Sequence, residues 1–240
     1  MLQQACEGKQ NDPLWQQAGI TEQDAERYRE MLEYVEQCLQ LPRNSSVGKT
    51  SIDYKRFEHT KRVTSWAIRL YLACDEKERA RVNLDSLMVA TIFHDSGYNS
   101  CQDMADHGNE GARIAAEYLE SVGYERDQIV EICDLIAHHS RKDLLKSGDI
   151  SGSLVILMEA DWLDDMGAMG IVMDTWIQAA SNPEVSFASI KGHIERYTLR
   201  QQYKNRDVLR SKAALRFWDE KTAITQAFFD QLCRDLEDPL

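Results

Sequence analysis

Apolar residues recur at steps of three and four along most of this 240-residue chain. In the segment 57–73 this spacing is shown by Val63, Trp66, Ala67, Leu70 and Tyr71. Such spacing places apolar side chains on one face of a helix, whereas a half-buried strand needs alternation. We find no convincing alternating run, and the short apolar stretch at 155–158 continues at the helical spacing. The sequence therefore predicts an all-α fold without an internal repeat.

The helical segments are expected at 21–41, 57–73, 84–93, 110–121, 129–139, 154–173 and 187–236. Thr21 suits an N-cap and Gly123 suits a C-cap, so both mark helix ends. We expect one globular unit in three parts. These are an N-terminal helical segment (1–49) packed on the core, the core itself (50–180) and a C-terminal helical extension (181–240).

The charge balance weakens one class of function. The chain has 28 basic and 40 acidic side chains, a formal net charge of −12. Binding to long nucleic acids depends on Lys and Arg that neutralise phosphates, so the acidic balance disfavours it. Small phosphorylated substrates remain compatible, because a metal ion or a few local cations can offset the overall field.

The chain carries no sign of a membrane or secretory destination. The first fifteen residues lack the apolar core of a signal peptide, and the longest apolar runs are far too short to span a bilayer. Six scattered cysteines with no CxxC pair suit reduced thiols. We expect a cytoplasmic protein with no membrane partner.

Most of the chemical information lies in the histidines. Five of the six fall between residues 59 and 139 as His59, His94-Asp95, His107 and His138-His139, and Asp161 follows in an apolar segment. Both pairs directly follow apolar helices, so their side chains can converge where helices meet. A carboxylate such as Asp161 is costly to bury unless a cation or hydrogen bonds compensate it. Divalent metals take imidazole and carboxylate ligands from different helices, so the pattern indicates a metal site.

Five motifs occur in an order that resembles the HD-domain superfamily of metal-dependent phosphohydrolases, most of all its small stand-alone bacterial members. They are FEHTKRV at 57–63, ATIFHDSGY at 90–98, HGNEGARIAAEYL at 107–119, LIAHHS at 135–140 and EADWLDDMGAMGI at 159–171. The resemblance implies an HD-domain helical bundle, here with an extra N-terminal helix and a C-terminal extension. HDSG replaces the common HDIG and no GYP triplet follows, which gives little support to a cyclic-di-GMP phosphodiesterase.

The same resemblance implies the roles of individual residues. The metal ligands would be His59, His94, Asp95 and Asp161. The ion would be Mn²⁺ or Mg²⁺ before Fe, Co or Ni. Asp95, Arg62 and His138 are the residues expected to act in catalysis. Arg62 lies one turn after His59 and is the best candidate for a phosphate-binding cation, with a salt bridge to a carboxylate such as Glu58 as the alternative.

His107, His138 and His139 would form either a second metal site or a phosphate pocket. The sequence leaves both open, and we favour one tightly bound metal. Arg141 and Lys142 could steer phosphate, although solvated loop charges are commoner. Asp164 is expected to orient a ligand or cap a helix, the structural role being favoured.

The expected activity is hydrolysis of a small phosphate ester or phosphoanhydride, with a nucleotide as the favoured substrate. An alternative is an HD-type di-iron oxygenase, whose six ligands would be His59, His94, Asp95, His107, His138 and Asp161. A non-catalytic scaffold is disfavoured, because no ligand is missing. A homodimer is compatible with the apolar extension, and His193 is expected to lie outside the site.

Overall fold

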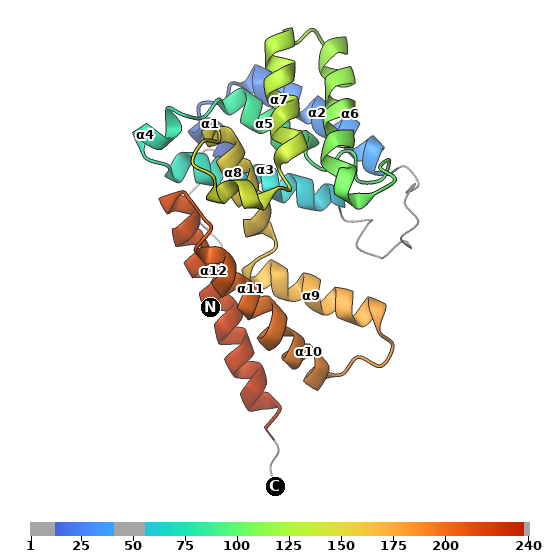
Figure 1. Ribbon diagram of the computed structural model, residues 1–240, viewed down its shortest axis with the longest axis vertical. Coiled ribbons are helices and arrows are strands. Elements are labelled where there is room, and N and C mark those ends of the chain that lie inside the picture. Colours follow the sequence, from blue (N-terminus) through green and yellow to red (C-terminus); the bar gives the residue numbers. More distant parts are fainter. Residues whose placement is uncertain (1–12, 41–55, 238–240) are drawn as a thin grey trace.

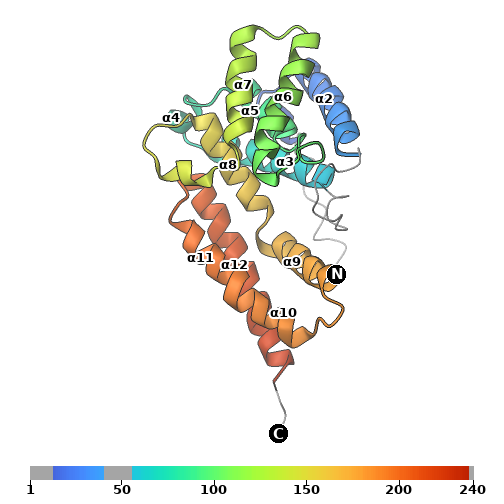
Figure 2. The same cartoon turned by 45° about the vertical axis from the view of Figure 1, so that its right-hand side comes forward.

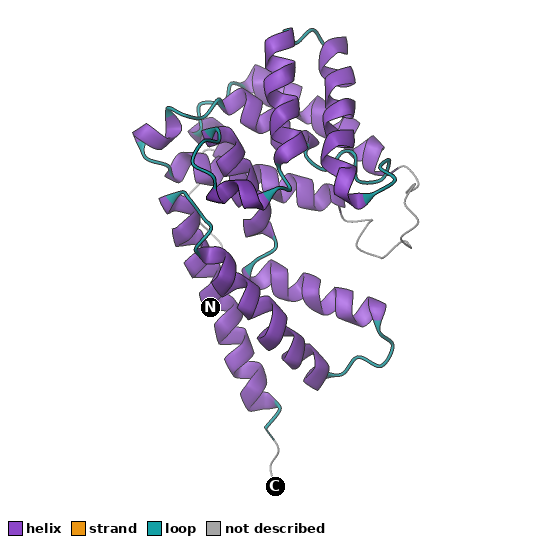
Figure 3. Cartoon of the chain, in the orientation of Figure 1, coloured by secondary structure: helices purple, strands orange, loops and turns teal. Residues whose placement is uncertain are grey.

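The computed structural model describes residues 13–40 and 56–237. Within these ranges the secondary structure is helical and contains no strand, which confirms the all-α prediction (Figure 3). The elements of the core are α1 (Leu14–Gln17), α2 (Glu22–Gln40), α3 (Arg56–Ala73), α4 (Glu76–Arg79), α5 (Leu84–Phe93), η3 (Met104–Asp106), α6 (His107–Ser121), α7 (Arg126–His138), η4 (Lys142–Lys146) and α8 (Gly152–Asp164). They are followed by α9 (Gly167–Ser181), α10 (Phe187–His193), the π-helix η5 (Ile194–Leu199), α11 (Arg200–Arg206) and α12 (Lys212–Asp235).

Helix α5 forms the centre of the core. Every residue from Ser86 to Phe93 is buried, and the helix packs against α2, α3, α6, α7 and α8. A helix that is apolar all round is stable only when surrounded. Its start is fixed by Asn83, whose side chain accepts a hydrogen bond from the Ser86 amide at 3.2 Å. The central helix thus delivers its C-terminal residues, His94 and Asp95, to the interior.

The apolar segment 154–173 is two helices rather than one. Helix α8 ends at Asp164 and α9 begins at Gly167, whose φ of +64° lies in the left-handed region that favours glycine. The break lets α9 leave the core and pack against α12 (Figures 1 and 2). In the structure the helices from α9 onward pack against one another. The domain boundary at 180/181 remains a prediction.

The long amphipathic segment 187–236 is also interrupted. Helices α10 and α11 are joined by the π-helix η5, and a turn at 207–211 precedes α12. Ser211 caps α12 by accepting a hydrogen bond from the Ala214 amide at 3.0 Å. These helices form a separate layer below the core in Figure 1. Among the described residues, no helix is long and apolar enough to cross a bilayer.

A fully buried carboxylate connects the core to the C-terminal helices. Glu159 on α8 is 0% exposed and accepts hydrogen bonds from the Arg210 amide at 2.6 Å, the Ser211 amide at 3.0 Å and the Ser211 hydroxyl at 2.6 Å. Three donors around one carboxylate compensate the cost of burying it. Glu159 thereby fixes the start of α12 on the core.

Replacing Glu159 by alanine should destabilise the protein by about 3 kcal/mol, because it leaves those donors buried without an acceptor. Chemical denaturation followed by circular dichroism measures this change. Glu220→Ala on the exposed face of α12 is the control and should change stability by less than about 0.5 kcal/mol. Equal effects of the two substitutions would contradict the proposed connection.

Candidate metal centre

The turn after α5 brings two potential ligands into the core. His94 is 0% exposed and Asp95 is 3% exposed. A Cβ added at Gly97 would lie 2.4 Å from the Gly111 amide nitrogen, so only glycine lets α6 approach this turn so closely. The glycine of the HDSG sequence is thus explained by packing, which places α6 and its His107 beside Asp95.

His59 and His94 present ring nitrogens to each other on one side of Asp95. Their Nε2 atoms lie 3.4 Å apart, and they lie 3.7 Å and 3.4 Å from Asp95 Oδ2. The Nδ1 of His59 donates to Asp164 Oδ2 and that of His94 donates to the Thr91 carbonyl oxygen, each at 2.8 Å. A carbonyl oxygen and an ionised carboxylate have no proton to donate, so Nδ1 carries the proton in both rings. When the ring is neutral, the lone pair of Nε2 therefore faces the cluster.

Asp161 completes this first group. Its Oδ1 lies 3.1 Å from His59 Nε2, while its Oδ2 accepts from Lys142 Nζ at 2.7 Å. Lys142 also donates to the Met158 carbonyl oxygen at 3.0 Å and is only 13% exposed in its side chain. Lys142 is therefore no solvated loop charge, and it holds Asp161 with one oxygen toward His59.

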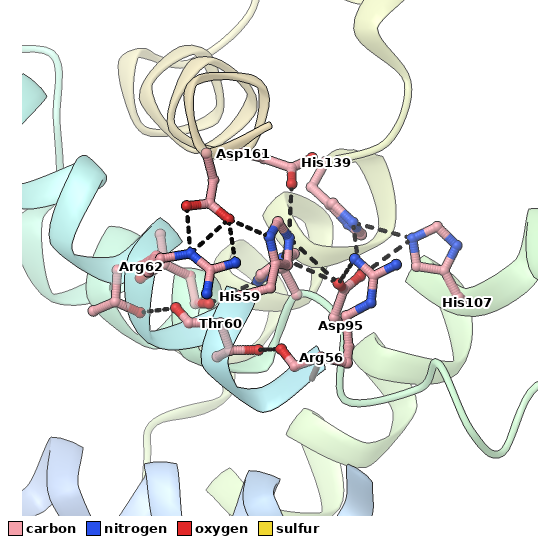
Figure 4. A network of polar contacts seen from close by, with 12 residues as sticks. Arg56, His59, Thr60, Arg62, Asp95, His107, His139 and Asp161 are labelled. Carbon is pink, nitrogen blue, oxygen red and sulfur yellow. Dashed lines mark hydrogen bonds and ion pairs between the residues drawn. The ribbon is translucent and has the colours of Figure 1, made fainter. Parts of the chain in front are cut away.

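A second pair of histidines lies on the other side of Asp95. The Nε2 atoms of His107 and His139 are 3.2 Å apart and lie 3.5 Å and 3.6 Å from Asp95 Oδ1. Their Nδ1 atoms donate to the carbonyl oxygens of Met104 and Ile136, each at 2.6 Å. Figure 4 shows Asp95 between His59 on one side and His107 and His139 on the other. Each carboxylate oxygen of Asp95 thus faces its own pair of imidazoles.

His138 lies outside this arrangement, contrary to its predicted place in the site. Its side chain is 37% exposed, and its Nδ1 contacts the carbonyl oxygen and the side chain of Asp134. Successive residues of a helix point about 100° apart, so only one member of the His138-His139 pair can face inward. The inward residue is His139, which is 2% exposed. His193, on α10, also lies outside the cluster, 4.0 Å from Asp174.

Two arginines from α3 lie beside the centre. Arg62 donates to both oxygens of Asp164, from Nε at 2.8 and 3.1 Å and from NH2 at 2.9 Å. Its carboxylate partner is therefore Asp164 rather than Glu58. Asp164 in turn accepts the hydrogen bond from His59 Nδ1, so the ion pair helps to orient His59. Arg56, which the sequence analysis missed, lies 3.0 Å from Asp95 Oδ2 and stacks 4.1 Å above the centroid of the Tyr98 ring.

The pKa shifts of the cluster show which of its groups are charged. Burial lowers the pKa of His94 to about 4, so this imidazole stays neutral. Burial also opposes protonation of His59, but the hydrogen bonds to Asp161 and Asp164 outweigh it and raise the pKa of His59 to about 10. Burial alone would raise the pKa of Asp95, whereas Arg56 and the surrounding histidines hold it well below its usual range. Asp95 is therefore ionised although it is buried, as a metal ligand must be.

The donor set fits divalent metal ions. His59, His94 and Asp95 form one group whose ligand atoms lie within 4.8 Å of one another, and Asp95, His107 and His139 form another. Asp95 Oδ2 is buried, and although Arg56 NH1 lies 3.0 Å from it, the two atoms are not aligned as a hydrogen bond. Imidazole with carboxylate suits first-row metals, and the second nitrogen of each ring is already fixed by a hydrogen bond. Either group could hold an ion, with Asp95 shared between them.

Comparison with known proteins agrees with this geometry. The HD domain family matches residues 56–166. The fold is similar to that of Bacillus subtilis YpgQ in complex with ADP, at 17% identity and a TM-score of 0.61 over 88% of this chain and 96% of that one. It is also similar to an HD-superfamily hydrolase from Bacillus thuringiensis, at 19% identity and a TM-score of 0.62 over 88% and 97%. No curated protein matches significantly. Residues 56–166 of this chain match the HD domain family, and this segment is therefore an HD domain.

Proposed function

We propose that this chain is a metal-dependent phosphohydrolase that cleaves a small phosphate ester or phosphoanhydride, and that its substrate is a nucleotide. The observation that carries the proposal is the convergence of His59, His94, Asp95 and Asp161 on one buried point. These four residues would hold Mn²⁺ or Mg²⁺. Such an ion, when bound, polarises a phosphoryl oxygen and makes a bound water acidic.

The residues around the ligands have supporting tasks. Asp164 accepts the Nδ1 proton of His59 and so fixes its tautomer, which directs Nε2 into the centre. Lys142 donates a hydrogen bond to Asp161 Oδ2 and so orients this carboxylate, which leaves Oδ1 toward the centre. Arg56 and Arg62 line the adjoining cleft, where guanidinium groups can bind phosphoryl oxygens. Arg62 stays anchored to Asp164 and 30% exposed, so it would reach a phosphate only with its remaining N–H groups.

The size of the cleft supports a nucleotide. It has a volume of about 410 Å³ and reaches the centre at His59. Organic ligands the size of a nucleotide occupy pockets of roughly 300–1,000 Å³. The fold neighbour YpgQ has been determined in complex with ADP. A nucleotide with its phosphates at α3 would fill this space, whereas inorganic phosphate would not.

Protein stripped of metal and reloaded with Mn²⁺, Mg²⁺, Co²⁺ or Fe²⁺ tests the proposal. We expect phosphate or pyrophosphate release from at least one nucleoside mono-, di- or triphosphate with Mn²⁺ or Mg²⁺, and none after EDTA treatment. His193→Ala should retain the activity, because His193 lies outside the ligand cluster. Failure of every nucleotide and of a generic phosphate ester with all four metals would refute hydrolysis.

A di-iron oxygenase is the second candidate, because Asp95 lies between two histidine pairs. The structure supplies six potential ligands for it, with His139 in the place predicted for His138. Metal content of protein purified without added metal distinguishes the two candidates. Two irons per chain together with no phosphate release would favour the oxygenase over the hydrolase.

A further inference from the structure

The cleft beside the metal centre lies between the HD core and the C-terminal helices. One wall belongs to α3 and carries Arg56, His59 and Arg62. The opposite wall belongs to α9, η5 and α11, which lie in the lower layer of Figures 1 and 2 together with α10 and α12. The family match ends at residue 166, so the second wall lies outside the matched HD domain. The C-terminal helices thus line the cleft in addition to packing on the core.

The two walls differ in charge. Both arginines of the lining are on α3, and the C-terminal wall contributes no Lys or Arg. It contributes Asp174 instead, whose Oδ2 accepts from the Thr198 hydroxyl at 2.6 Å. A phosphate would be attracted to the α3 wall and repelled by Asp174. The part of a ligand that reaches the C-terminal wall should therefore be uncharged.

The C-terminal wall is rich in side-chain amides. Gln201, Gln202 and Asn205 line the cleft from α11. Gln202 is 3% exposed, and its Oε1 is buried without a hydrogen-bond partner among the described residues. A buried amide oxygen left unpaired costs free energy, and a small turn of the amide toward a ligand N–H would recover it. The π-helix that precedes α11 is a rare local geometry that is frequent at functional sites.

Aromatic and apolar side chains complete the lining. Trp162 and Tyr197 line the cleft together with Met173 and Ile177. Flat rings and apolar groups next to amides suit a planar heterocycle with hydrogen-bonding edges, because bases stack on aromatic side chains and pair with Asn and Gln. A sugar phosphate or an inorganic polyphosphate would offer neither a flat face nor amide-like edges.

We propose that the C-terminal wall binds the base of a nucleotide, and that Gln201, Gln202 and Asn205 determine which base is accepted. This inference rests on the proposed function for the placement of the phosphates at α3. It makes the C-terminal helices, and not the HD domain, the source of substrate discrimination.

Equilibrium binding to the full chain in EDTA tests this without any turnover. The probes are the four common nucleoside triphosphates and inorganic tripolyphosphate, each compared between the native protein and the double variant Gln202→Met/Asn205→Leu. Gln231→Met is the matched control, since Gln231 is exposed on α12 and remote from the cleft. Thermal unfolding confirms that each variant is folded.

We expect at least one nucleotide to bind the native protein about tenfold or more tightly than tripolyphosphate. Tripolyphosphate has no base and lacks the one or two hydrogen bonds that a base would make with the amides. In the double variant this preference should fall below about threefold, with tripolyphosphate binding unchanged. Equal binding of tripolyphosphate and all nucleotides, no binding of any probe, or a preference that survives in the double variant would overturn the inference. A base preference in EDTA combined with no hydrolysis under any metal would instead refute only the proposed function.

Discussion

Asp95→Asn should sharply reduce hydrolysis and remove metal-dependent stabilisation. Each oxygen of Asp95 faces a different pair of imidazoles, and an asparagine would replace one acceptor by an N–H₂ group and remove the charge. We expect kcat/KM to fall on the order of a thousandfold, beyond the 10–100-fold typical of residues that only support ligands. The measurement is steady-state kinetics with Mn²⁺ at saturating concentration.

The thermal signature is independent of any substrate. A ligand at a hundred times its dissociation constant stabilises the folded state by about 2.7 kcal/mol, which corresponds to a rise in Tm of roughly 5–10 °C for a chain of this size. Native protein should show this rise on addition of Mn²⁺, and Asp95→Asn should not. Asp134→Asn is the matched control, because Asp134 is 64% exposed in its side chain and pairs with the outward His138. An unchanged Mn²⁺ shift in Asp95→Asn would show that the ion binds elsewhere.

The sequence was sufficient for the fold class, and four residues predicted as ligands lie close together in the structure. His59, His94, Asp95 and Asp161 come from three helices, yet their order along the chain and the apolar runs before them predicted their meeting. What it could not resolve was the direction of neighbouring side chains. His138 and His139 are both polar residues at the end of one helix, and only the packing of α7 on α5 and α6 determines which of them is buried.

Cations were harder to predict than ligands. Arg62 follows His59 by one turn and indeed lies near the centre, but Asp164 binds its guanidinium. Arg56 precedes His59 by three residues, and the same helical spacing could have identified it. Lys142 lies in a polar segment whose composition predicts solvent exposure. Its contact with Asp161 depends on how η4 packs against α8. Pairings of this kind join segments distant in sequence and leave no local pattern.

The break at 165–166 was the main difference in the fold. Apolar residues continue across it, so periodicity predicted one helix, whereas the glycine at 167 takes a left-handed conformation and redirects the chain. This change of direction forms the C-terminal wall of the cleft. A single turn that periodicity overlooks therefore determines where the cleft lies.

His139→Ala and His138→Ala should differ sharply although the residues are adjacent. His139 is 2% exposed, and its Nε2 lies close to His107 Nε2 and Asp95 Oδ1. Its replacement by alanine removes one of the two imidazoles that face Asp95 Oδ1. We expect His139→Ala to lower kcat/KM by about a hundredfold, because His139 lies in the ligand cluster. His138→Ala should leave kcat/KM within about threefold, because His138 lies outside the cluster.

The metal content of the same two variants determines what the second pair does. If His107 and His139 hold an ion, native protein binds two Mn²⁺ per chain and His139→Ala binds one, with His138→Ala unchanged. If they contact phosphate instead, native protein and both variants bind one Mn²⁺, and His139→Ala mainly raises KM. Equal activity losses in the two variants would contradict the placement of His139 inward, because the structure gives His138 no contact with the centre.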